Sequence, residues 1–232
     1  MHRLDAVQLK VALTGEDARQ AAAGLPVRPT GDEWTVRFWE DRAGAVGHLP
    51  LYERGVILRA RQPGAGAGVS TVKLRPGRRS LLTARWLALG QAGDLRLRVE
   101  EDWAVDRVLV ASLDAPRPAA APPHELVLTG VQREFLAECG GVVRLDGLTG
   151  VGPVRVRRCW PVFWQGHRIA AGWWMADGGP DILELTLRVE PAGAEVVWRA
   201  FDTRLRDCGV VAVQRRRTTE VLLERLTPPG NP

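Results

Sequence analysis

The sequence has few cysteines, almost no lysine and no long hydrophobic run, and each shortage excludes a class of protein. Its three cysteines, Cys139, Cys159 and Cys208, are widely spaced, and the chain contains no CxxC or Cys/His cluster. A zinc site is therefore not expected, and we predict three buried, reduced thiols. No apolar run approaches the ~20 residues that a membrane-spanning helix needs.

Several signals of targeting and of common enzyme classes are also missing. The N-terminus has no apolar signal-peptide segment, because Asp5 and Lys10 interrupt it, so we expect a cytoplasmic protein. The glycines of residues 64–68 precede neither a Gly-Lys-Ser/Thr sequence nor a helix, which argues against a phosphate-binding P-loop. The serines occur in no GxSxG context, so serine-hydrolase chemistry has no support.

The remaining composition is that of an ordinary globular protein of 232 residues, with 45% hydrophobic and 25% charged residues. The net charge is +5, and arginine supplies nearly all of the basic charge. Its planar guanidinium suits phosphate, because it donates two parallel hydrogen bonds and stays charged. Ala115–Pro123 (APRPAAAPP) predicts a stiff linker between an N-terminal half, 1–114, and a C-terminal half, 124–232, of a single domain, 1–232.

Short segments in both halves alternate apolar with polar or basic residues, which is the signature of β-strands. The alternating segments are Ala6–Leu13, Val56–Arg61, Thr71–Arg75, Leu95–Glu100, Val154–Arg157 and Ile182–Val189, with further strands expected at Trp34–Trp39, Trp103–Leu109 and Arg168–Met175. The predicted helices are Glu16–Ala23, Ser80–Leu89, Thr129–Cys139, Ala192–Cys208 and Thr219–Leu226. This pattern favours a sandwich, whose polar faces meet solvent, or a wide barrel, whose polar faces line the lumen.

Two neighbouring segments carry the most specific resemblance to a known family. Leu51–Arg61 (LYERGVILRAR) is similar to the pattern Leu-Tyr-x-x-Gly-hydrophobic-x-Leu-Arg-x-Arg of the CYTH, or triphosphate-tunnel, family. Ser70–Pro76 (STVKLRP) is similar to its Thr-hydrophobic-Lys-x-Lys/Arg strand. Trp34–Asp41 and Arg98–Trp103 resemble further strands of the family, in the same order.

The resemblance continues in the second half and covers most of the chain. Leu148–Arg157, Ile182–Arg188 and Gln214–Leu223 resemble segments of an actinobacterial-type branch of the family. It implies a mainly β, α+β fold: a closed, eight-stranded antiparallel tunnel barrel with flanking helices. In that family, basic side chains in the tunnel hold a triphosphate, and glutamates hold one or two divalent cations, Mg²⁺ or Mn²⁺.

Carried over residue by residue, the resemblance assigns candidate roles to ten side chains. The implied phosphate contacts are Lys10, Arg59, Arg61, Lys73, Arg75, Arg98, Arg157 and Arg188. The implied inward carboxylates, serving as metal ligands and as catalytic groups, are Glu100 and Glu184.

The family's opening motif, Glu-x-Glu-x-Lys, is incomplete here. Ala6 and Gln8 stand at the two glutamate positions, and Lys10 is retained. Ala cannot ligate a metal, and Gln offers a neutral oxygen where a charged one is needed, so metal affinity is expected to fall. Glu40, together with Glu100 and Glu184, is a candidate for rebuilding a partial site.

Three functions remain open from the sequence. The first is a metal-dependent triphosphatase acting on inorganic triphosphate or a nucleotide, with adenylyl cyclase as a less favoured variant. The second is a binding module that still holds such an anion after losing its metal site. The third, nucleic-acid binding, is disfavoured because the basic residues alternate within strands and form no contiguous patch. No membrane partner is expected, and the oligomeric state is left open.

Overall fold

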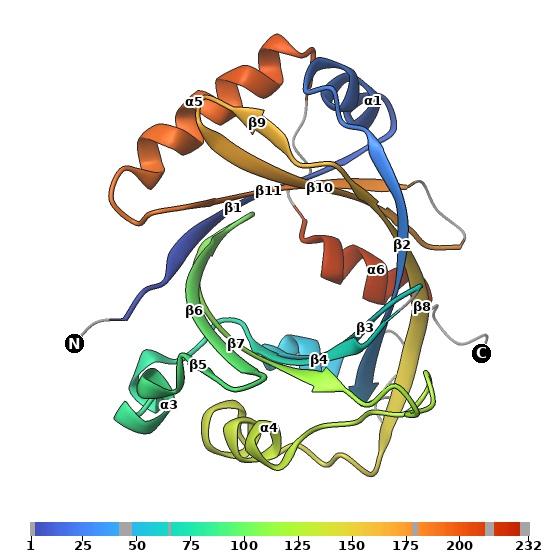
Figure 1. Ribbon diagram of the computed structural model, residues 1–232, viewed down its shortest axis with the longest axis vertical. Coiled ribbons are helices and arrows are strands. Elements are labelled where there is room, and N and C mark those ends of the chain that lie inside the picture. The colour runs from blue at the N-terminus through green and yellow to red at the C-terminus, as the bar shows by residue number, and fades with distance from the viewer. Residues whose placement is uncertain (1–2, 42–47, 65, 178–180, 212–215, 228–232) are drawn as a thin grey trace.

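A computed structural model describes residues 3–41, 48–64, 66–177, 181–211 and 216–227. Nine strands close into a barrel around a lumen (Figure 1). In order around the barrel they are β1 (Ala6–Thr14), β11 (Ile182–Val189), β10 (His167–Met175), β8 (Leu148–Cys159), β2 (Pro29–Asp41), β3 (Val56–Pro63), β4 (Gly68–Leu74), β7 (Arg107–Arg117) and β6 (Leu95–Trp103). Two short strands, β5 (Gln91–Ala92) and β9 (Val162–Trp164), pair with β6 and β10.

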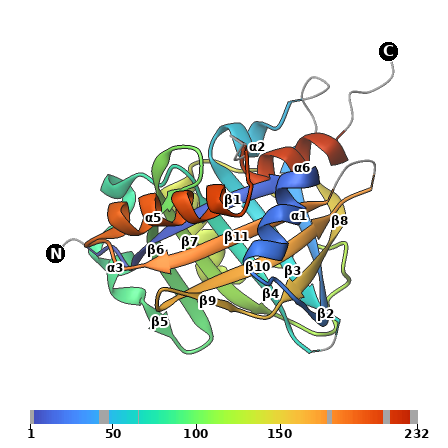
Figure 2. The ribbon, with the colours of Figure 1, turned by 90° about the horizontal axis from the view of Figure 1, so that it is seen from above.

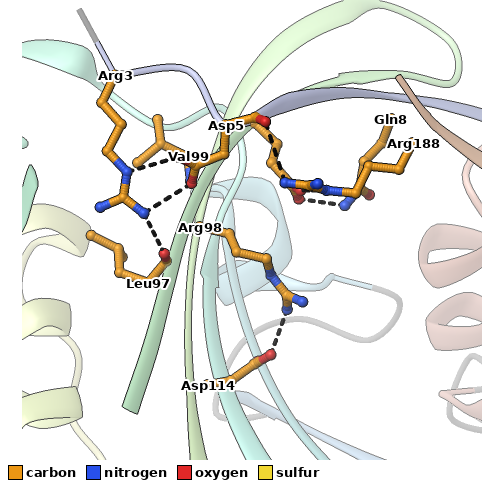
Figure 3. A network of polar contacts seen from close by, with 9 residues as sticks. Arg3, Asp5, Gln8, Leu97, Arg98, Val99, Asp114 and Arg188 are labelled. Atoms are coloured by element: carbon orange, nitrogen blue, oxygen red, sulfur yellow. Dashed lines mark hydrogen bonds and ion pairs between the residues drawn. The ribbon is translucent and has the colours of Figure 1, made fainter. Parts of the chain in front are cut away.

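The closed, mainly β barrel confirms the predicted fold class, but the predicted eight-stranded, fully antiparallel arrangement is wrong in detail. Every other neighbouring pair in the ring is antiparallel, so an odd number of strands brings two strands of the same direction together at the closure. These are β1 and β6, which pair in parallel with Ala6 opposite Glu100. The residues before β1 fasten this seam: Arg3 donates to the Leu97 carbonyl at 2.7 Å, and Asp5 accepts from the Val99 amide at 2.8 Å (Figure 3).

Helices cover the outside of the barrel and bury the apolar faces of its strands. Figure 2 shows α1 (Gly15–Gly24) and α5 (Ala194–Asp207) over β1, β11 and β10, where they enclose one apolar cluster. On the opposite side, α3 (Ala84–Leu89), α4 (Gly130–Phe135) and the π-helical turn Leu136–Gly140 enclose a second. Since the apolar faces point outward, the polar faces of β1, β3, β4 and β6 line the lumen.

One helix lies at an end of the barrel and packs against the inner face of its strands. In α6 (Thr218–Leu226), Val221, Leu222 and Leu223 join an apolar cluster with Phe38 and Ile57 from the inner faces of β2 and β3. The same contact reverses the polarity of β8: its valines belong to this cluster, and its alternate arginines are exposed outside. The expectation of an inward basic face at Val154–Arg157 is therefore wrong, because that stretch faces an apolar helix.

Other local predictions are confirmed or corrected. Thr129 and Gln132 form the predicted capping box at the start of α4. The strand expected at Trp103–Leu109 is interrupted, since β6 ends at Trp103 and β7 begins at Arg107. The first three residues of the predicted linker belong to β7, and strands from both predicted halves share one sheet.

Three further points concern elements and residues on the periphery. Two short helices, α2 (Pro50–Glu53) and the 3₁₀ turn Arg79–Leu81, precede β3 and α3. The three cysteines are free thiols, and burial raises the pKa of Cys139 to about 11. Among the described helices, none has the length and apolar character to cross a membrane.

The contact between α6 and the barrel wall predicts the effect of a cavity. Leu222 is fully buried. We expect Leu222→Ala to lower the free energy of unfolding by about 2–5 kcal/mol, because the barrel wall cannot collapse onto the space left. Val196→Ala, on the exposed face of α5, is the control and should change it by less than about 0.5 kcal/mol. Equal effects in chemical denaturation would show that α6 is not held in the barrel.

Candidate functional site

Within the part of the chain that the structure describes, the lumen contains two neighbouring cavities. The larger, about 390 Å³, is lined by Trp34, Arg61 and Arg158 among others. The smaller, about 60 Å³, lies beside the start of α6 and is lined by Lys10, Lys73, Arg75 and Arg217 among others. Both cavities share three lining residues: Arg59, Trp174 and Glu184. These three side chains therefore stand where one cavity passes into the other.

A buried aspartate gathers three cations beside the smaller cavity. Asp102 is 1% exposed, and its Oδ2 lies 2.8 Å from Lys10 Nζ, 3.6 Å from Lys73 Nζ and 3.5 Å from Arg75 Nη1. The only two lysines of the sequence thus meet at one carboxylate. Burial alone would raise the pKa of Asp102, but Lys10, Lys73 and Arg75 hold it well below its usual range. Burial and the neighbouring Lys10 in turn lower the pKa of Lys73 well below its usual range.

The Leu-Tyr-x-x-Gly segment positions Arg75. The Tyr52 hydroxyl accepts a 3.3 Å hydrogen bond from Arg75 Nη2, and the Gly55 carbonyl accepts one of 2.7 Å from the Arg75 amide. Gly55 has φ +79°, and a Cβ at this position would lie 2.5 Å from the Arg75 carbonyl oxygen. Glycine is required there because no side chain fits between the two backbones.

Arg59 is the least compensated cation of the lumen. Its side chain forms no hydrogen bond and no ion pair with any described residue, and its Nε is fully buried. Burial, followed by repulsion from Arg61, lowers the pKa of Arg59 to about 9. The guanidinium is therefore still charged at neutral pH. Asp114 and Glu184 act on Arg59 only through space, without a direct contact.

A second buried aspartate binds cations next to the larger cavity. Asp114 accepts a 2.6 Å hydrogen bond from Thr71 Oγ1, pairs closely with Arg98 (Figure 3), and lies 3.5 Å from Arg61 Nη2. The Nε atoms of Arg61 and Arg98 are buried without a hydrogen-bond acceptor among the described residues. Here too the guanidinium groups have more donors than the protein satisfies.

Two arginines flank an aromatic ring at the wide end of the lumen. The guanidinium carbons of Arg61 and Arg158 lie 5.9 Å and 5.3 Å from the centre of the Trp34 ring. Such cation–π contacts hold a guanidinium in place while leaving its N–H groups free to donate. Exposed Arg158 places this end of the lumen in contact with solvent.

Glu100 closes the polar network at the β1–β6 seam. Its carboxylate is almost fully buried; Oε1 accepts a 2.8 Å hydrogen bond from Arg188 Nε, and Oε2 accepts a close one from Gln8 Nε2. Arg188 also donates to the Asp5 carbonyl at 3.3 Å. Figure 3 shows Gln8 and Arg188 side by side at this point.

All but one of the predicted site residues lie on the lumen side of the barrel wall. Those that line the lumen or its polar networks are Lys10, Arg59, Arg61, Lys73, Arg75, Arg98, Glu100, Glu184 and Arg188. The exception is Arg157, which is exposed and lies opposite Trp173 in the register, on the outer face. Its neighbour Arg158 lines the larger cavity instead.

Sequence reasoning missed Asp102, Asp114 and Arg158. The alternation of Arg98 and Glu100 along β6, extended by two residues, could have identified Asp102. No comparable signal marks Arg158, since it shares the phase of the apolar residues Val154 and Val156 and not that of the basic residues Arg155 and Arg157. Gln214 and Arg215 of the predicted basic C-terminal segment lie outside the described residues.

Glu40, considered for a partial metal site, has a structural role. Its carboxylate accepts hydrogen bonds from the amides of Leu51 at 2.6 Å and Tyr52 at 3.1 Å. It therefore satisfies the free amides at the start of α2. Burial raises the pKa of Glu40, and these amide hydrogen bonds oppose that rise.

The lumen carboxylates do not fit a divalent cation. Mg²⁺ and Mn²⁺ need several ionised oxygen ligands converging on one point. Among the described residues, no group of three or more His, Cys, Asp or Glu side chains is arranged to hold a metal. Glu100 and Glu184 are not brought together: in the β1–β11 register Glu184 pairs with Ala12, whereas Arg188, the partner of Glu100, pairs with Gln8.

Solved structures, and not sequence relatives, support the fold. No protein-family model and no curated protein matches the sequence. Among solved structures, the chain is similar to HpAC1 from Hippeastrum, a protein proposed as an adenylyl cyclase and described as having a dominant triphosphatase activity; the TM-score is 0.55, the identity 15%, and 94% of each chain is covered. It is also similar to the PH1819 protein from Pyrococcus horikoshii OT3, with TM-score 0.50, 16% identity, and coverage of 95% of this chain and 99% of the other.

These likenesses confirm the CYTH-type tunnel fold that the sequence resemblance predicts. At such identities they speak for the fold alone. The actinobacterial-type branch stays a prediction.

The Asp102 cluster predicts a pH-dependent loss of stability. We expect Asp102→Asn to lower the free energy of unfolding at pH 7 by about 3–5 kcal/mol, since it leaves three buried cations uncompensated. The folded-state pKa of Asp102 lies below its unfolded value of about 4. Its stabilisation is therefore present above about pH 4 and is lost as the pH falls toward the folded-state pKa.

The measurement is urea denaturation of both proteins between pH 7 and pH 2. The difference between them should shrink at the acid end. Asp146→Asn, in an exposed ion pair with Arg144, is the control and should cost less than about 1 kcal/mol. A difference that does not vary with pH would contradict an ionised Asp102.

Proposed function

We propose that this chain is a CYTH-like tunnel protein that binds a linear polyphosphate-bearing anion, such as inorganic triphosphate or a nucleotide, inside its lumen. The observation that carries the proposal is Arg59, a cation at the centre of the lumen whose side chain has no hydrogen-bond or ion-pair partner among the described residues. A buried, unpaired charge is unfavourable unless a partner of opposite sign binds it. We further propose that residues 1–232 act as one domain in the cytoplasm.

The charge balance of the lumen supports an anionic ligand. Its basic side chains outnumber its carboxylates, and the Nε donors of Arg59, Arg61 and Arg98 have no acceptor among the described residues. A phosphate chain offers many anionic oxygens, and charge-assisted hydrogen bonds to guanidinium are among the strongest in proteins. Few other small anions carry enough charge to satisfy cations spread along two cavities.

The shapes of the two cavities suggest how such an anion lies. The cavity of about 60 Å³ beside Lys10, Lys73 and Arg75 has room for a terminal phosphoryl group. Arg59 then meets the next group at the junction, and the remainder of the ligand extends into the larger cavity. Trp34 and Trp174 line that cavity, where they offer apolar surface to any ring attached to the phosphates.

Replacing Arg59 tests the proposal, because function and stability should change in opposite directions. We expect Arg59→Gln to weaken triphosphate binding about 10- to 100-fold, the loss of one or two charge-assisted hydrogen bonds. The free protein should be as stable as wild type or more stable, since the substitution removes an unpaired buried charge. Calorimetric titration and thermal unfolding measure the two effects.

An adjacent pair of arginines provides the matched control. Arg158 lines the larger cavity, whereas Arg157 lies on the outer face of the same strand. Arg158→Gln should weaken binding, and Arg157→Gln should not. Equal triphosphate affinities of the wild type and all three variants would contradict binding in the lumen. Triphosphate at ~100 times the dissociation constant measured by calorimetry should stabilise the wild type by ~2.7 kcal/mol, and the absence of any thermal shift would contradict it as well.

A second candidate function is hydrolysis of the bound anion, and Glu184 favours it. This carboxylate lies at the junction of the cavities and forms no hydrogen bond or ion pair with other described residues. A carboxylate in this position can accept a proton from a water molecule whose oxygen attacks the terminal phosphorus, while the anhydride bond to the next phosphate breaks and the shortened phosphate chain leaves. Glu100, the other predicted catalytic carboxylate, has both oxygens engaged by Gln8 and Arg188.

Glu184→Gln separates hydrolysis from binding. If the wild type releases phosphate from triphosphate, we expect the substitution to slow release at least ~100-fold, as for loss of a general base. Triphosphate affinity should stay equal or increase, because a like charge is removed from the anion's path. Phosphate release that survives the substitution would rule out Glu184 as the base. If the wild type releases no phosphate, hydrolysis is excluded and only the binding function remains.

A further inference from the structure

We infer that the side chains of this tunnel supply the positive charge that a divalent cation would otherwise bring, so that anion binding needs no metal and is weakened when a divalent cation competes for the anion. This inference rests on the proposed function. It concerns a different question, which is the origin of the charge that neutralises the phosphates.

The strongest observation is the pairing of Glu100 with Arg188. The two oxygens of this buried carboxylate are bound by a guanidinium N–H at 2.8 Å and by the Gln8 amide. A divalent cation would have to approach the same oxygens. The Gln8 side chain offers its NH₂ group to Glu100, and that group cannot ligate a metal. The site is therefore already filled by a cation that belongs to the chain.

The other buried carboxylates also contact cations of the chain. Asp114 pairs with Arg98 and Arg61, whereas Asp102 contacts Lys10, Lys73 and Arg75 through its Oδ2 alone, and its Oδ1 is buried without a hydrogen-bond partner among the described residues. A metal at Asp114 would have to displace its cations, and a metal at Asp102 Oδ1 would be repelled by the three cations that contact the same carboxylate. Breaking a buried ion pair is strongly unfavourable, because it leaves a charge without compensation.

Only Glu184, among the lumen carboxylates described, has no direct cationic contact. A single carboxylate is a weak site for Mg²⁺ or Mn²⁺, which need several oxygens. A metal could reach this lumen only as a complex with the phosphates themselves. Such a complex carries less negative charge and fewer free oxygens than the bare anion, so a lumen built from cations binds it less tightly.

The test compares triphosphate binding with and without divalent cations. The full chain is titrated with triphosphate first in EDTA and then at increasing concentrations of Mg²⁺. The concentration of free triphosphate is calculated from the stability constants of its Mg²⁺ complexes. We expect full affinity in EDTA. The apparent dissociation constant for total triphosphate should rise in inverse proportion to the fraction of triphosphate that is free of metal. Loss of binding in EDTA, or a tenfold gain in affinity with Mg²⁺, would overturn the inference.

A second measurement needs no anion and therefore separates this inference from the proposed function. The double variant Gln8→Glu/Arg188→Gln removes the guanidinium and places a second carboxylate beside Glu100. We expect Mn²⁺ to raise the melting temperature of the double variant by several degrees and to leave that of the wild type unchanged. A Mn²⁺ response of the wild type as large as that of the double variant would overturn the inference, whether or not triphosphate binds.

Discussion

The structure depends on one electrostatic constraint: a closed barrel must hold many cations in its lumen without help from bulk water. Three buried carboxylates, Glu100, Asp102 and Asp114, meet this constraint by pairing with most of the cations. Arg59 is left over at the junction of the two cavities. An anion that binds there completes the compensation, so a buried charge that is unfavourable in the free protein is also the basis of its proposed function.

The same constraint explains where apolar side chains enter the lumen. The cations occupy the part of the tunnel bounded by β1, β3, β4 and β6, whereas α6 closes an end whose inner surface is apolar. The valines of β8 face inward because Leu222 and its neighbours pack against them. Charged and apolar surfaces therefore meet within the lumen: Val36 and Val156 line the larger cavity together with Arg59 and Arg61, and exposed Arg158 marks where this cavity meets solvent.

Strand register and the side chains on neighbouring strands distinguish this lumen from a metal centre, and composition reveals neither. A sequence with Glu100 and Glu184 on inward positions suggests two ligands for a cation. The register of β1 and β11 places them apart, and Arg188 occupies the position beside Glu100. Which carboxylates meet is decided by strand register, and whether they are free is decided by the side chains on the neighbouring strand.

The sequence by itself determined most of the local structure. Period-two alternation fixed which residues of β1, β3, β4 and β6 share a face, and the Thr129–Gln132 capping box fixed the start of α4. Only the tertiary structure decided that nine strands close with one parallel pair, that Arg158 and not Arg157 enters the lumen, and that Glu40 binds the start of α2. The physical reason is that alternation assigns residues to two faces of a strand, whereas the direction of each face depends on what covers it: outer helices for most of the barrel, and α6 from within for β8.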